Sequence, residues 1–316
     1  MKTPIAALGG ILALALGGAA LADYPERAIT LIVPYSPGGG GDTVARIVAD
    51  RLAAELGQTI NVVNRQGAGG EIGIAEMAAA DADGYTLGVF GYPDNFVLSQ
   101  TRETEFGGDS FEYLASFDAM PMGIFASPAS AFSSLDALKE YGEANPGALV
   151  VGQSGALGLL NILAFADGLG IEVTPLNYGG GGELMNGLLG NHIDLASTSS
   201  MSHDNIVGAG GAPIGFAAGD RMAMFPDVPT FEEQGLPLDM GVSRVLVAPA
   251  GIPSDVRERL VAALDAISGD ADMIARFETA SLPYRYLGAD ATAEMVARSN
   301  AAYAEVIERN AEHFQQ

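Results

Sequence analysis

The residues best suited to bind a ligand form a glycine-rich segment from Pro34 to Asp42, which reads PYSPGGGGD. It lies between an apolar run of strand length, Ile29 to Val33, and a segment with helical spacing, Thr43 to Leu56. Glycines let the backbone approach a ligand closely, and the first turn of a helix presents free N–H groups and a partial positive charge. This arrangement is typical of an anion site, although alone it fits an ordinary tight turn equally well.

Asp42 closes this segment and is expected to be the N-cap of the helix that follows. A carboxylate at an N-cap accepts hydrogen bonds from N–H groups one turn into the helix. We therefore expect Asp42 to orient the loop, while the backbone N–H groups of the glycines bind the anion.

Two further segments have the same placement between a strand and a helix, namely Tyr178 to Gly182 and Gln153 to Gly155. Face to face across a cleft, such turns could hold a carboxylate from both sides through N–H groups, hydroxyls and bridging water. Thr198, after the expected strand Ile193 to Ser197, offers another hydroxyl. Arg244 is the best candidate for a cationic contact, and an arginine at the surface or at the edge of the core is the alternative.

The elements that position these turns follow a regular order. Apolar runs of strand length alternate with segments of helical spacing, which is typical of an α/β protein with largely parallel sheets. A first βαβαβ set ends with a strand at Tyr85 to Phe90. A second set ends at Ile193 to Ser197, and a return strand at Val242 to Ala248 precedes C-terminal helices.

The two sets and the returning strand predict two lobes joined by two crossings rather than a single sheet. We assign residues 23–120 and 245–316 to lobe 1 and residues 121–244 to lobe 2. Hinges are expected near Met120 and Val242, and the two crossings imply that the lobes close on a ligand.

The first residues predict an exported protein. Lys2 supplies a short basic start, and the apolar stretch from Ile5 to Leu16 is too short to span a bilayer. A small-residue site, Ala20 to Ala22, follows, so we predict a leader of residues 1–22 that is cleaved after Ala22. A retained membrane anchor and a buried first helix are the alternatives.

Composition excludes several classes of function. The formal net charge of -24 makes nucleic acid an implausible partner. The chain has no cysteine, which excludes thiol chemistry and thiolate metal sites. The acidic excess would repel an anion at long range, but salt screens that field within about 8 to 10 Å, so local geometry can overrule it.

Several segments together are similar to a known family of proteins. In order along the chain, they are Pro34 to Asp42, Asn64 to Gly70, Asp83 to Leu87, Tyr178 to Gly180, and Pro226 to Thr230 with Glu233 and Gly235. This ordered series resembles the solute receptors of tripartite tricarboxylate transporters, the Bug receptors, over almost the whole mature chain.

The resemblance implies an α/β, two-lobed type II periplasmic binding protein fold with the ligand in the interlobe cleft. It also implies a periplasmic receptor that delivers a small carboxylate, such as a di- or tricarboxylate or an aromatic acid, to a two-component membrane permease. We expect no cofactor and no metal, and a monomer.

In that family the first turn and the tyrosine-glycine turn of the second lobe grip a ligand carboxylate, partly through water. Family members commonly carry Ser or Thr where Gly40 and Gly41 stand here, so hydroxyl contacts are lost while N–H groups remain. The full set of candidate ligand-binding residues is Tyr35, Ser36, Gly38, Gly39, Gly40, Gly41, Asp42, Gly91, Gln153, Ser154, Tyr178, Gly179, Gly180, Thr198 and Arg244.

Two other classes of function are alternatives to a receptor. A secreted hydrolase could use Ser154, but Ala156 occupies the last position of the GxSxG pattern. The three histidines, His192, His203 and His313, are expected at the surface or in turns. A detached effector lobe of a transcription factor is disfavoured by the leader. We therefore predict a binding protein without catalytic residues.

Overall fold

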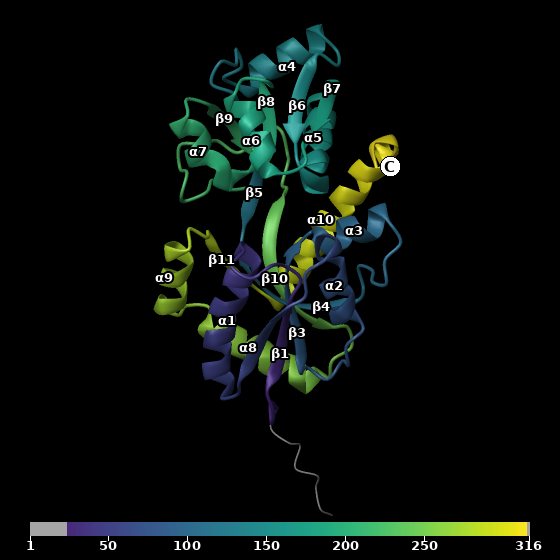
Figure 1. Ribbon diagram of the computed structural model, residues 1–316, viewed down its shortest axis with the longest axis vertical. Coiled ribbons are helices and arrows are strands. Elements are labelled where there is room, and N and C mark those ends of the chain that lie inside the picture. Colours follow the sequence, from purple (N-terminus) through teal and green to yellow (C-terminus); the bar gives the residue numbers. More distant parts are fainter. Residues whose placement is uncertain (1–23, 315–316) are drawn as a thin grey trace, which may run out of the picture.

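The computed structural model describes residues 24–314, and the predicted leader with its cleavage site lies outside this range. Within it the strands join in one sheet, in the order β2-β1-β3-β10-β5-β8-β6-β7, with β4, β9 and β11 paired off this path. Figure 1 shows the chain arranged as two groups of helices and strands, connected by β5 and β10. The expected α/β fold is confirmed.

The first group is built around parallel strands. Its elements are β1 (Ile29–Val33), α1 (Gly40–Leu56), β2 (Ile60–Asn64), α2 (Glu71–Ala78), β3 (Thr86–Tyr92), α3 (Asp94–Thr101) and β4 (Phe111–Asp118). Strand β1 pairs in parallel with both β2 and β3. The apolar stripe of α1, which includes Val44, Val48 and Leu52, is buried with β1 and β3 in one core cluster.

The second group repeats this pattern. Its elements are β5 (Met120–Ala126), α4 (Leu135–Ala144), β6 (Leu149–Gln153), α5 (Gly155–Leu169), β7 (Val173–Asn177), α6 (Gly181–Leu189), β8 (Leu195–Ser199), α7 (His203–Gly208) and β9 (Ala212–Phe216). Strand β6 pairs in parallel with β7 and β8, whereas β5 is antiparallel to β8 and β9.

The C-terminal part returns to the first group. It contains β10 (Gly241–Pro249), α8 (Ser254–Ile267), α9 (Ala271–Thr279), β11 (Tyr284–Gly288) and α10 (Ala289–Arg309). Strand β10 is antiparallel to β3, β4 and β5. The prediction of largely parallel sheets is therefore wrong, because parallel pairing is confined to the βαβ units and the strands that carry the chain across and back run antiparallel.

The two crossings lie side by side. Met120 and Val242, where we expected hinges, are partners in the register of β5 and β10. A Cβ atom added to Gly241 would lie 2.6 Å from the carbonyl oxygen of Met120, so the two backbones touch here. From Ser243 onward β10 pairs with strands of the first group instead.

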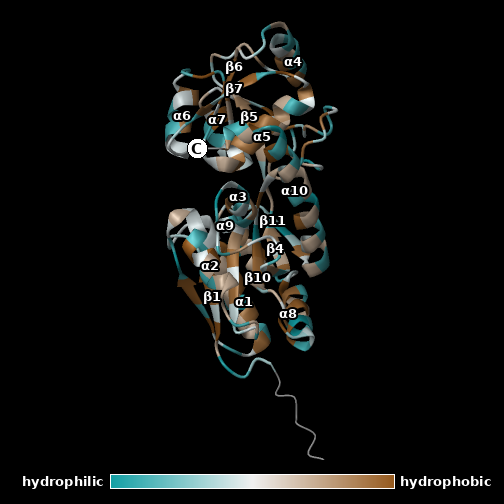
Figure 2. Ribbon diagram, turned by 90° about the vertical axis from the view of Figure 1, so that its right-hand side faces the viewer, coloured by the Kyte–Doolittle hydropathy of each residue, from teal (hydrophilic) through white to brown (hydrophobic). Residues whose placement is uncertain are grey.

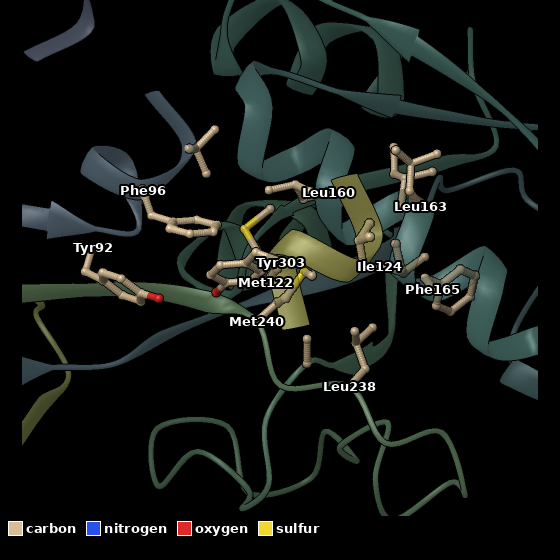
Figure 3. Packing of buried hydrophobic residues seen from close by; sticks show 14 of the residues in the cluster. Tyr92, Phe96, Met122, Ile124, Leu160, Leu163, Phe165, Leu238, Met240 and Tyr303 are labelled. Carbon is tan, nitrogen blue, oxygen red and sulfur yellow. The ribbon is translucent and has the colours of Figure 1, made fainter. Parts of the chain in front are cut away.

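Helix α10 contacts both groups of elements. It packs on β4 of the first group and on α5 of the second. Tyr303, on α10, is buried with its ring centroid 6.4 Å from that of Tyr92 and 6.2 Å from that of Phe96. Figure 3 shows Tyr303 beside Met122 of β5 and Met240, which precedes β10. The part of the chain after β10 is thus anchored on both sides of the crossings.

The hydrophobic residues are concentrated on the strands, and the outward faces of the helices are more hydrophilic (Figure 2). None of the helices in residues 24–314 combines the length and apolar character that crossing a membrane requires.

Candidate functional site

A pocket of about 870 Å³ opens at the carboxyl ends of β1 and β3. This is the edge at which ligands bind in open α/β sheets. Its lining residues are Pro34, Tyr35, Ser36, Gly39, Gly40, Gly41, Gln66, Gly67, Gly69, Gly70, Gly91, Asp94, Val242 and Arg244. The pocket brings together most of the first glycine turn with Gly91 and Arg244, which lie far from it in the sequence.

The first turn of α1 faces this pocket with free donors. Helix α1 begins at Gly40, three residues earlier than expected, and its N-cap is Gly39 in an extended conformation. Among the described residues, no acceptor is paired with the backbone N–H groups of Gly40 and Gly41. These groups and the positive end of a 17-residue helix can bind an anion.

The expectation that Asp42 is the N-cap is wrong, because the glycines before it already adopt helical backbone angles and place Asp42 inside the first turn. Its carboxylate instead reaches back to accept a hydrogen bond of 2.8 Å from the N–H of Gly38. It also accepts from Arg46 and Asn64, each at 2.9 Å. Burial raises the pKa of Asp42, but the hydrogen bonds outweigh burial and hold the pKa below its usual value. Asp42 therefore fixes the turn from within.

Tyr35 connects the glycine turn to β3 and α3. Its hydroxyl donates a hydrogen bond of 2.5 Å to Oδ2 of Asp94 and accepts one of 2.8 Å from the N–H of Gly91. Burial, and then the charge of Asp94, raise the pKa of Tyr35 well above its usual value, so the hydroxyl stays a neutral donor. A Cβ atom on Gly41 would lie 2.6 Å from Cδ2 of Tyr35, so glycine makes room for this ring.

Arg244, on β10, places its guanidinium above the start of α1. Nη1 donates to Oδ2 of Asp118 at 2.6 Å, and the backbone N–H of Arg244 donates to Oδ1 of Asp118 at 2.6 Å. A Cβ atom on Gly40 would lie 2.5 Å from Nη2 of Arg244. Gly40 therefore leaves the space that the guanidinium occupies.

Gly40 and Gly41 thus have a structural reason to be glycine. Each provides room for a polar side chain, that of Arg244 from β10 in one case and that of Tyr35 from the same turn in the other. The donors at this end of the pocket are the guanidinium and the free N–H groups.

Asp94 is the charged lining residue that sequence reasoning missed, together with the uncharged Gln66, Gly67, Gly69, Gly70 and Val242. It is the first residue of α3, a helix that we did not expect, and it follows β3 by two residues. Burial outweighs the hydrogen bond from Tyr35 and the charge of Arg244, and raises the pKa of Asp94 to about 6. Its position after the third expected strand, at the same edge as the glycine turn, was the available signal.

The candidate residues of the second group share a different edge of the sheet. Because β6 is parallel to β7 and β8, Gln153, Tyr178 and Thr198 lie at or just beyond neighbouring strand ends. Gln153 is buried, and its Nε2 donates to Asn177 at 3.1 Å, while its Oε1 has no partner within residues 24–314.

Part of the second glycine turn already makes contacts within the protein. The N–H of Gly179 donates to the carboxylate of Glu183 at 3.0 Å, and Tyr178 packs against Gly187.

Several candidates do not line the pocket at α1, namely Gly38, Asp42, Gln153, Ser154, Tyr178, Gly179, Gly180 and Thr198.

The part of the chain that is described contains no catalytic arrangement that would support the hydrolase alternative. The side chain of Ser154 makes no hydrogen bond to a histidine there. His203 is partly buried, bonded to Asp204 at 2.8 Å, with its ring 4.3 Å from that of Phe225. Residues 24–314 also contain no cluster of side chains that could hold a metal ion.

Comparison with known proteins identifies relatives over most of the chain. The family described as tripartite tricarboxylate transporter family receptor matches residues 44–310. A protein of Agrobacterium vitis, the UPF0065 protein in the TAR-I ttuE-ttuC' intergenic region, is 31% identical over 80% of this chain and 75% of its own. The protein BugT of Bordetella pertussis is 32% identical over 68% of each chain.

Solved structures agree with this result. A TctC solute binding protein from Polaromonas has a TM-score of 0.83, with 90% of this chain and 99% of that chain covered, and at 24% identity it shows the fold alone. The periplasmic binding protein BugD is 26% identical, with a TM-score of 0.65 and coverage of 90% and 98%. MatC from Rhodopseudomonas palustris, solved with bound malate, is 25% identical, with a TM-score of 0.68 and coverage of 90% and 100%.

The raised pKa of Asp94 predicts a dependence of stability on pH. The native state binds more protons than the unfolded chain between the usual pKa of 3.8 and about 6, so stability falls as pH rises through this window. We expect Asp94→Asn to be more stable than the wild type at pH 8 by up to about 3 kcal/mol, and equal to it at pH 4. Tyr35 and Arg244 are the titratable groups that face Asp94.

Urea unfolding at a series of pH values measures this difference. Asp227→Asn, at an exposed carboxylate, is the control and should follow the wild type. A constant offset between Asp94→Asn and the wild type over pH 4 to 8 would contradict the assignment.

Proposed function

The chain belongs to the tripartite tricarboxylate transporter receptor family, and we propose that it binds a small organic carboxylate at the start of α1 and delivers it to the permease subunits of such a transporter. This family consists of solute-binding receptors and not of enzymes, which overturns the hydrolase alternative. The observation that carries the proposal is the meeting of free N–H groups of α1 with the guanidinium of Arg244 in one pocket.

The physical chemistry of this pocket favours an organic anion. Each hydrogen bond to a charged group contributes about 1.5 to 3 kcal/mol, so a few N–H groups and one guanidinium can hold a carboxylate. Nη1 of Arg244 is committed to Asp118, whereas Nη2 lies above Gly40 on the side of the helix start. The malate bound to MatC supports a small carboxylate as the ligand class.

We propose that the ligand site is completed by the second group of elements, with residues 23–120 and 245–316 forming lobe 1 and residues 121–244 forming lobe 2. The turns at the ends of β6, β7 and β8 would then supply the opposite contacts, from Gln153, Ser154, Tyr178 to Gly180 and Thr198. The paired crossings at Met120 and Val242 support hinges at these positions.

The protein is proposed to act in the periplasm as a monomer. Its leader would be residues 1–22, and the mature chain would begin at Asp23. Intact mass spectrometry of protein recovered from the periplasm of an expressing Gram-negative cell checks this cleavage, and a mass that includes Met1 would contradict it.

A thermal-shift screen against organic acids tests the binding proposal. A ligand at about 100 times its dissociation constant adds about 2.7 kcal/mol to stability, so binding acids raise the melting temperature. We expect Gly39→Val to abolish this shift while the protein remains folded. The backbone at Gly39 is extended, and an added Cβ atom meets only the carbonyl oxygen of Ser36 at 3.5 Å, so valine fits the fold but fills the pocket.

Gly269→Val is the matched control, because a Cβ atom there meets nothing within 4 Å and the residue lies outside the pocket. It should respond to acids as the wild type does. Unchanged shifts in Gly39→Val would rule out this pocket, and a screen without any carboxylate hit would reject the ligand class.

Closure of the lobes is tested by small-angle X-ray scattering. We expect the radius of gyration to fall when a saturating acid from the screen is added, because the ligand contacts both lobes and the crossings act as hinges. Gly39→Val at the same acid concentration should show no change. Identical profiles of the wild type with and without acid would contradict closure.

A further inference from the structure

We infer that Asp94 makes the receptor selective for carboxylates that also carry a hydrogen-bond donor, a hydroxyl or an ammonium group, close to the carboxylate. This inference rests on the proposed function, because it names the class of acid that the same pocket would take. It is carried by the placement of an acidic side chain in the wall of a pocket that otherwise presents donors.

The carboxylate of Asp94 has one oxygen available to a ligand. Oδ2 accepts the hydrogen bond from Tyr35, whereas Oδ1 makes no hydrogen bond within residues 24–314. The residue lines the pocket and is only partly buried. A carboxylate oxygen accepts hydrogen bonds and donates none, so a ligand can form a hydrogen bond with Oδ1 only through a donor group.

Gly91 allows Tyr35 and Asp94 to pack closely against the end of β3. A Cβ atom on Gly91 would lie 3.2 Å from the hydroxyl of Tyr35, 3.3 Å from Cγ1 of Val242 and 3.4 Å from Oδ2 of Asp94. Any larger residue at position 91 would therefore press on these three side chains and disturb the hydrogen bond between Tyr35 and Asp94.

Tyr35 is not free to serve the ligand in place of Asp94. Its hydroxyl hydrogen is directed to Asp94, and its oxygen accepts from the N–H of Gly91. In this arrangement Tyr35 positions the carboxylate, and the contact with the ligand falls to Asp94.

The charges around the pocket also favour a ligand that carries a hydrogen-bond donor. The guanidinium of Arg244 is already paired with Asp118, and Asp94 has no ion pair among the described residues. The group formed by Arg244, Asp118 and Asp94 thus has one positive and two negative side chains. An acid without a donor brings a further negative charge to Asp94, whereas an ammonium or hydroxyl group converts that contact into an attraction.

Isothermal titration calorimetry at pH 7.5 tests the selectivity with sets of acids that share a carbon skeleton. The sets are succinate with malate and aspartate, glutarate with 2-hydroxyglutarate and glutamate, and propionate with lactate and alanine. In the set that binds, we expect the donor-bearing acid to bind at least about tenfold more tightly than the plain acid. Comparison of the hydroxy and amino acids distinguishes a hydroxyl from an ammonium group.

Asp94→Asn separates contact with the ligand from support of Tyr35. The amide oxygen can still accept from Tyr35, but the negative charge is gone and the remaining amide N–H groups are donors. We expect plain acids to bind more tightly to this variant, and amino or hydroxy acids to bind at least about tenfold more weakly. Tyr35→Phe removes the supporting hydroxyl and keeps the carboxylate, so it should preserve the order of preference.

The outcomes are distinct. If acids bind the wild type and donor-bearing members have no advantage, the inference fails and the proposed function stands. If Asp94→Asn weakens every member of a set by the same factor, Asp94 only positions Tyr35, and the inference fails as well. If none of these acids binds but the thermal-shift screen finds acids without a donor, the inference fails and the proposed function stands. If the screen finds no carboxylate at all, the proposed function fails with it.

Discussion

The arrangement of this molecule depends on the ion pair between Arg244 and Asp118. Asp118 ends β4 at the first crossing, its side chain is completely buried, and Arg244 supplies both a guanidinium and a backbone N–H to it. A buried carboxylate without such partners is strongly destabilising, so β10 must enter the sheet in the register that brings Arg244 to this point. The same pairing holds the guanidinium above Gly40, and the candidate pocket at α1 is thereby coupled to the crossings between the two groups.

Much of the fold was predictable because hydrophobic periodicity is a local property. The strand Ile29–Val33 was predicted at its observed bounds, and the helix after the glycine turn was predicted to end at Leu56, where it does end. The antiparallel direction of β10 was not predictable in this way, since direction depends on the path of the whole chain. Helix α3 was missed because its eight residues carry a weak apolar stripe and follow directly on a strand.

The site was predictable to the extent that it is built from one continuous segment. The glycine turn and its helix could be recognised from Pro34 to Leu56, and Arg244 was identified as the cation. The place of Asp94 in the site could not be predicted, because it depends on a hydrogen bond from Tyr35, which lies 59 positions earlier in the sequence. The N-cap was misplaced for a related reason, since glycines at Gly40 and Gly41 read as loop when the packing of Arg244 and Tyr35 against them is unknown.

Two glycine turns that look alike in sequence differ in what surrounds them. In the first, added Cβ atoms at Gly40 and Gly41 would collide with side chains from β10 and from the turn itself. In the second, Gly180, Gly181 and Gly182 meet nothing within 4 Å. Glycine at positions 40 and 41 is required by packing that already exists, whereas in the second turn only a Cβ atom on Gly179 would meet a side chain, the carboxylate of Glu183 at 2.9 Å. In the proposed site, the second turn would contribute through backbone N–H groups at the start of α6. The asymmetry favours a site in which the first group presents a preformed half and the second group adds its contacts on closure.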